Sequence, residues 1–135
     1  MLRTKTLMRK LVLPGIVFAC GMAGTVHAET LSSGPIYGGP TQNRVVCSVI
    51  NMGQAPITFS RTTIFSTFNG AVNPSFNDCV GSSAPGHICT TQAVAAPDQA
   101  YACKVITNGL EQGTVRATMR ANNSSNDVLI EEDLR

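Results

Sequence analysis

Histidine is scarce in this sequence, and no two cysteines have the two-residue spacing that metal and redox motifs use. The 135 residues include two histidines, His27 and His87, and five widely spaced cysteines. A hydrolase needs a base beside its nucleophile, so a chain this poor in histidine offers little for such chemistry. Zinc sites and disulfide-exchange enzymes often use Cys-x-x-Cys pairs, so both functions are disfavoured as well.

A helical repeat is also missing. No segment after residue 28 repeats apolar residues with a period of 3.6, which disfavours helical folds. Residues 29–43 are rich in Gly and Pro and predict an extended, only partly ordered lead-in. Within 44–135, short β-rich segments alternate with turns, which is typical of a small antiparallel β-sandwich. Strands are predicted at 44–50, 57–65, 87–94, 101–106, 114–121 and 128–130.

We interpret residues 1–28 as a secretory signal peptide. Four basic residues and no acidic one precede an apolar core at 11–24, and small residues follow at 26 and 28. The core has 14 residues, fewer than the roughly 20 needed to span a bilayer. We therefore expect export with cleavage between Ala28 and Glu29, and no transmembrane segment in the mature chain.

Cys20 offers an alternative route to the same compartment. The stretch Val17-Phe-Ala-Cys20 resembles the lipobox of bacterial lipoproteins, in which the cysteine becomes a lipidated N-terminus. Phe18 departs from that motif, which usually has a small residue there. Cleavage after Ala28 is the preferred interpretation, and lipidation at Cys20 is the alternative.

The signal peptide accounts for the basic character of the whole chain. Four of the ten Lys and Arg residues and none of the eight Asp and Glu residues lie within 1–28, so the mature chain has a net charge of −2. A nucleic-acid partner is therefore disfavoured. The acidic residues near the C-terminus lack the fixed loop spacing of a calcium site and predict a solvated tail. We expect neither metal nor cofactor. These acidic residues are Asp127, Glu131, Glu132 and Asp133.

The strand at 114–121 has the clearest alternation in the chain. Its apolar residues occupy every second position, which indicates one buried and one solvated face. The solvated face is a polar stripe that either provides solubility and edge protection or binds an anionic glycan or partner protein. This stripe consists of Thr114, Arg116, Thr118 and Arg120.

Four cysteines remain after the signal peptide, and an even number in an exported chain predicts two disulfides. A hairpin turn at 82–86 would place Cys79 opposite Cys89, leaving Cys47 to pair with Cys103. A hairpin around residue 96 would instead pair Cys89 with Cys103, and Cys47 with Cys79. The first pairing is preferred, and the second stays open.

Two resemblances bear on these residues. The stretch Asp98-Gln-Ala-Tyr-Ala-Cys103 is similar to the Asp-x-Ala-x-Tyr-x-Cys stretch of immunoglobulin-type sandwiches, one residue shorter. This similarity implies a sandwich in which Cys103 bridges the sheets to Cys47, although the tryptophan of that family is absent. Several motifs also resemble a group of small, uncharacterised, exported bacterial proteins that have one four-cysteine β-sandwich. These are Tyr37-Gly-Gly-Pro40, the segments 46–53, 84–89 and 115–117, and the ending Asp133-Leu-Arg135.

The group implies no activity, so the functional hypothesis follows from the domain type. We expect a non-enzymatic, secreted or periplasmic β-sandwich that acts as a binding or structural module, with a protein or glycan at the cell surface as partner. One alternative is a subunit of a pilus or coat built by strand exchange. The other is an enzyme with an unrecognised site.

The mass of the exported protein tests the processing site. We expect the intact mass to match residues 29–135 with two disulfides. A mass that corresponds to a chain beginning at a lipidated Cys20 would contradict cleavage after Ala28. A Cys20→Ser variant that is exported with an unchanged mature mass is the matching control.

Overall fold

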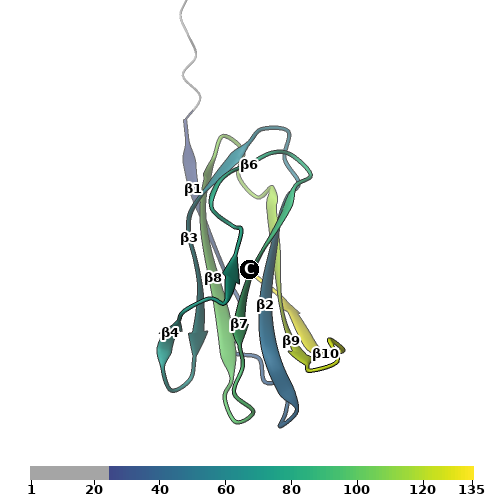
Figure 1. The fold of residues 1–135 in the computed structure, drawn as a ribbon. Coiled ribbons are helices and arrows are strands. Elements are labelled where there is room, and N and C mark those ends of the chain that lie inside the picture. The colour runs from purple at the N-terminus through teal and green to yellow at the C-terminus, as the bar shows by residue number, and fades with distance from the viewer. Residues whose placement is uncertain (1–24) are drawn as a thin grey trace, which may run out of the picture.

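The structure, a computed structural model, describes residues 25–135, which form two antiparallel β-sheets and no helix. Figure 1 shows the sheets as two layers, with β1, β3 and β8 in one and β2, β9 and β10 in the other. The predicted all-β sandwich is therefore confirmed. No described segment is an apolar helix long enough to cross a membrane. Residues 1–24, which include Cys20 and most of the predicted signal peptide, lie outside the described residues.

The sheet that contains β1, called sheet A, has the order β1-β8-β3-β4, with β6 also paired to β3. Its strands are β1 (His27–Ser32), β3 (Ile57–Ser66), β4 (Gly70–Val72), β6 (Gly81–Ser83) and β8 (Tyr101–Gly109). Sheet B has the order β10-β9-β2-β7-β5. Its strands are β2 (Gln42–Asn51), β5 (Phe76–Asn77), β7 (Ile88–Val94), β9 (Val115–Asn123) and β10 (Val128–Asp133).

Period-two alternation places one face of each long strand in the core. Every second residue of β9 from Val115 to Ala121 is buried, while Arg116 between them is exposed. The central strands β2 and β8 follow the same pattern, so the two inner faces meet in one apolar layer. The fully buried side chains of this layer include Val45, Cys47, Val49, Ile64, Cys103, Val105, Val115 and Met119.

The Cys47–Cys103 disulfide joins the two sheets through this layer. Cys47 lies on β2 and Cys103 on β8, with their Cα atoms 6.2 Å apart. The Cys103 backbone N–H donates to the Ser33 hydroxyl, which in turn donates to the Met119 sulfur at 3.4 Å. The preferred pairing is therefore confirmed, and the Cys89–Cys103 alternative is wrong.

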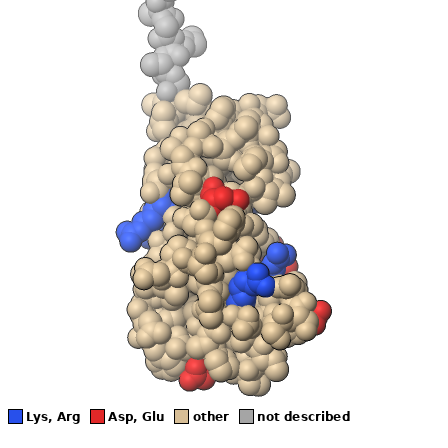
Figure 2. Space-filling view, viewed as in Figure 1, with Lys and Arg blue, Asp and Glu red and all other residues tan. Residues whose placement is uncertain are grey.

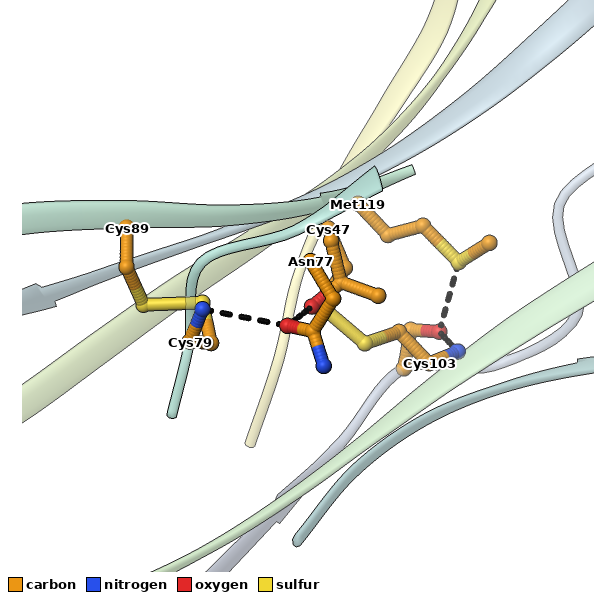
Figure 3. Close-up of a disulfide and its surroundings, with 8 residues drawn as sticks. Cys47, Asn77, Cys79, Cys89, Cys103 and Met119 are labelled. Atoms are coloured by element: carbon orange, nitrogen blue, oxygen red, sulfur yellow. Dashed lines mark hydrogen bonds between the residues drawn. A yellow bond between two sulfur atoms is a disulfide. The ribbon is translucent and has the colours of Figure 1, made fainter. Parts of the chain in front are cut away.

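The Cys79–Cys89 disulfide forms for a different reason than the sequence suggested. The hairpin considered at 82–86 does not form, because the chain leaves sheet B after Cys79 and β6 pairs with β3 of sheet A. Cys79 instead follows β5, whose Asn77 pairs with Thr91 of β7, and this register places Cys79 opposite Cys89. Figure 3 shows the Asn77 side chain between the two disulfides, where its Oδ1 accepts from the Cys79 N–H and the Thr91 hydroxyl.

The Tyr101 side chain stabilises the turn between β7 and β8 through a hydrogen bond. It lies two residues before Cys103, and its hydroxyl accepts a hydrogen bond from the Ala96 N–H at 2.8 Å. Tyrosine corners of immunoglobulin-type sandwiches make the same kind of contact to backbone a few residues upstream. The strand order differs from that of immunoglobulin-type sandwiches. In that family the last strand pairs with the strand that carries the second cysteine. Here β1 pairs with β8, and β9 pairs with β2.

The two ends of the domain are more ordered than the sequence predicted. Part of the lead-in forms β1 on the edge of sheet A, with Ala28 opposite Asn108 and Glu29 opposite Thr107, so the predicted cleavage bond lies inside a strand. The acidic residues near the C-terminus are exposed, as expected, but they continue β10 as far as Asp133 rather than forming a free tail. Leu134 is then buried, and the backbones of Arg135 and Ser32 exchange two hydrogen bonds that connect the sheet edges.

Removing each disulfide should lower the free energy of unfolding according to the loop that it closes. We expect a loss of about 4 kcal/mol for the double variant Cys47→Ala/Cys103→Ala and about 3 kcal/mol for Cys79→Ala/Cys89→Ala, because their cysteines are 56 and 10 residues apart. Urea unfolding followed by circular dichroism measures both. A larger loss for the second variant would contradict this order.

The tyrosine corner predicts unequal effects of removing the two tyrosine hydroxyls. Tyr101→Phe should cost about 1 to 3 kcal/mol of unfolding free energy, because it leaves the Ala96 N–H without its acceptor. The control is Tyr37→Phe, whose exposed hydroxyl donates to the Pro97 carbonyl and is replaceable by water. That variant should stay within about 0.5 kcal/mol of the parent. Equal losses in urea unfolding would contradict a special role for Tyr101.

Candidate functional site

His87 lies in the turn before β7, where its exposed ring approaches one serine. The His87 Nδ1 is 3.5 Å from the Ser83 hydroxyl, at the outer limit of a hydrogen bond. Ser83 is only 4% exposed, and no carboxylate hydrogen-bonds to either side chain within residues 25–135. A catalytic serine needs substrate access and a base oriented by a third group. This pair has neither feature and instead links β6 to the turn.

Asp78, Cys79 and Cys89 bring possible metal ligands within 4.8 Å of one another. Both sulfur atoms, however, belong to the disulfide, and a metal binds the free thiolate. The Asp78 carboxylate is also engaged, since its Oδ1 accepts from the Thr90 backbone N–H at 2.5 Å. These contacts attach the segment after β5 to β7.

The acidic residues near the C-terminus are spread along β10 and its turn. Asp127 bonds to Asn123 within the β9–β10 hairpin, and Glu132 accepts from the Gly34 N–H at 3.2 Å. Glu131 lies opposite Arg120 in the strand register. Among residues 25–135, none of these acidic residues belongs to a group of three possible metal ligands.

Buried amide side chains hold the loops at both ends of β2. At one end, Asn51 donates to the carbonyls of Ala55 and Ser83 and accepts from the Gly53 N–H. At the other end, Gln42 donates to two carbonyls of the β7–β8 turn and accepts from the Gly38 N–H. Sequence reasoning missed both residues, because a polar residue at a strand end looks like an ordinary turn former.

The outer face of sheet B carries three arginines, and we call it the arginine face. It contains the predicted Arg116 and Arg120 of β9 together with Arg44 of β2. The outward-facing residues of β2 and β9 lie opposite one another: Arg120 is paired with Val46, and Arg116 is paired with Ile50. Figure 2 shows a cluster of basic side chains over the region of β2, β9 and β10, separate from another at the opposite side.

Two hollows lie beside the arginine face. The first has a volume of about 660 Å³ and lies at the edge of sheet B, because the outer-face residues Ile50 and Arg116 line it together with core residues of both sheets and with Asp133. The second, which we call the hairpin hollow, has a volume of about 290 Å³ and lies beside the β9–β10 turn. It is lined by Arg44, Val46, Gln92, Arg120, Asn122, Asn126 and Val128.

The outer face of sheet A provides a comparison. Arg61 and Lys104 lie on it beside a smaller hollow of about 150 Å³, which Phe65 also lines. This smaller hollow therefore has two cations like the hairpin hollow, but no amide side chain lines it.

Sequence reasoning identified Arg116 and Arg120 but missed Arg44, Gln92 and Asn122. Those three residues lie on separate strands, and only the β2–β7 and β2–β9 registers bring them to one face. No protein family model, curated protein or solved structure matches this chain. The geometry of the arginine face is therefore the basis for a functional proposal.

Proposed function

We propose that this protein is a non-enzymatic, exported β-sandwich that binds an acidic glycan at the cell surface through its arginine face. The observation that carries the proposal is the position of three arginines on one outer face, two of which line the hairpin hollow. Guanidinium groups recognise carboxylates with paired hydrogen bonds, which makes arginine suited to an anionic ligand. Because the mature chain has a net charge of −2, an anionic glycan would be attracted to this face and not to the protein as a whole.

Export is supported by the N-terminal sequence and by the disulfides. Two disulfides are compatible with an extracytoplasmic location, since cytoplasmic thiols are kept reduced. A periplasmic or secreted binding module fits both features. The resemblance to small exported four-cysteine sandwiches supports the same proposal.

A non-enzymatic role is supported by the groups that would otherwise be catalytic. Ser83 is buried beside His87, and the four cysteines of the described domain are joined in disulfides. Neither set offers an accessible nucleophile with an oriented base.

Strand exchange in a pilus or coat is the second candidate, and one edge favours it. The β10 register ends at Thr118, and the Leu134 N–H bonds to the Ala117 carbonyl. Among the described residues, Val115 and Arg116 therefore have no strand beside them on this side, next to the larger hollow. An unpaired strand edge is where an added strand would dock.

Affinity electrophoresis of the mature chain through gels containing polysaccharide tests glycan binding. We expect polygalacturonate to retard the protein and neutral dextran to have no effect, with retardation that weakens as salt rises. Arg116→Ser/Arg120→Ser should abolish the retardation. The matched control, Arg61→Ser/Lys104→Ser, removes two cations from the other face and should migrate like the parent in the polygalacturonate gel.

Three results would contradict this proposal. The first is the absence of retardation by polygalacturonate, and the second is its loss in the control variant instead of the arginine-face variant. The third is a ladder of oligomers that forms with rising concentration independently of polysaccharide, which would favour strand exchange.

A further inference from the structure

We propose that the hairpin hollow is a binding site for one carboxylated sugar residue, a hexuronate. This inference rests on the proposed glycan-binding function and names the chemical group that the arginine face recognises. The hollow has a volume of about 290 Å³, near the lower end for ligand pockets, which suits a single sugar ring.

Two residues of the lining each have a buried polar atom without a partner. Within residues 25–135, four buried side-chain nitrogen or oxygen atoms have no hydrogen-bond partner, and two of them belong to this lining. These two are the Arg120 Nε, a donor, and the Asn122 Oδ1, an acceptor. Asn122 is only 6% exposed, and its amide nitrogen already donates to the Asn126 carbonyl. Buried polar atoms in folded proteins are nearly always paired, and the exceptions call for an explanation such as a ligand.

The second arginine is already held in position. Arg44 donates to the Gln92 Oε1 at 3.2 Å and also to the Asn126 Oδ1. Asn126 sits in the β9–β10 turn, where Asn123 accepts from two backbone N–H groups and fixes the loop. A guanidinium oriented in advance loses less entropy when it binds a carboxylate.

The charge of the hollow suits an anion. Two guanidinium groups line it, and no carboxylate does. Glu131 lies opposite Arg120 in the register of β10, but it is outside the lining. A carboxylate bound between the arginines would therefore meet two guanidinium groups and no carboxylate of the lining itself.

The Asn122 oxygen and the exposed Val128 restrict the chemistry of the ligand further. A carboxylate accepts hydrogen bonds and cannot donate to Asn122, so the ligand also needs a hydroxyl near its carboxylate. Val46 is only 4% exposed, so it lies beneath the hollow. Val128, which is 49% exposed, supplies the apolar contact that suits the C–H face of a sugar ring. Carboxylate, hydroxyl and apolar face occur together in a hexuronate.

Nuclear magnetic resonance of ¹⁵N-labelled mature protein titrated with glucuronate tests the site. We expect the side-chain amide of Asn122 and the Nε–H of Arg120 to shift in a saturable manner, with smaller changes at Gln92 and Asn126. Glucose, acetate and inorganic phosphate are titrated separately. They should bind at least about tenfold more weakly, since each lacks one of the required groups.

Two variants localise the effect. Arg44→Gln removes one guanidinium, and Asn122→Ala removes the unpartnered oxygen; each should weaken glucuronate binding by about tenfold or more. Arg61→Gln on the outer face of sheet A is the matched control and should bind like the parent. Amide shifts of residues far from the hollow report whether each variant is folded. Arg44→Lys keeps the charge and should recover only part of the affinity.

If acetate or phosphate binds as tightly as glucuronate, the hollow is a simple anion site and the proposal is wrong. If glucose binds as tightly as glucuronate, the carboxylate has no role in recognition and the proposal is also wrong. Glucuronate shifts that map to Phe65 and Lys104 would place the site on sheet A. If polygalacturonate still retards the protein while glucuronate leaves Asn122 unperturbed, this site is wrong and the proposed glycan-binding function stands. If polygalacturonate has no effect, the proposed function itself fails.

Discussion

The two sheets are joined covalently where β2 and β8 pass each other at the centre of the sandwich. The Cys47–Cys103 bond holds these strands with their Cα atoms 6.2 Å apart, and each strand has a long neighbour on both sides. Because β2 is fixed at the middle of sheet B, the strands β7 and β9 beside it share its register. The outer face that carries Arg44 and Arg120 is therefore positioned by a bond in the core beneath it.

Polar groups in the interior divide into two kinds. Asn51 and Gln42 are buried and have hydrogen-bond partners, and each of them holds a loop in place. Their pairing is what folding requires, since an unpaired buried polar group costs about 1 to 3 kcal/mol. Asn122 and Arg120 depart from that pattern, since each has one buried polar atom without a partner, and both residues line the hairpin hollow.

Local sequence pattern predicted most long strands but misjudged both ends of the domain. Residues 114–121 alternate strictly, and β9 forms there; the lead-in has no period, yet β1 pairs with β8. Edge strands depend on hydrogen bonds to a distant partner, which local composition does not reveal. The Cys79–Cys89 pairing shows the same limit, because it was predicted from a hairpin at 82–86 that does not form, while the actual cause is the β5–β7 register.

The sequence by itself determined the sandwich class, the inward and outward faces of the main strands and the outward direction of Arg116 and Arg120. These follow from period-two alternation, which is a local property of the chain. Only the tertiary structure decided that Arg44 and Asn122 line the same hollow as Arg120. Their proximity depends on the registers of strands far apart in sequence, which are set by long-range hydrogen bonding and core packing.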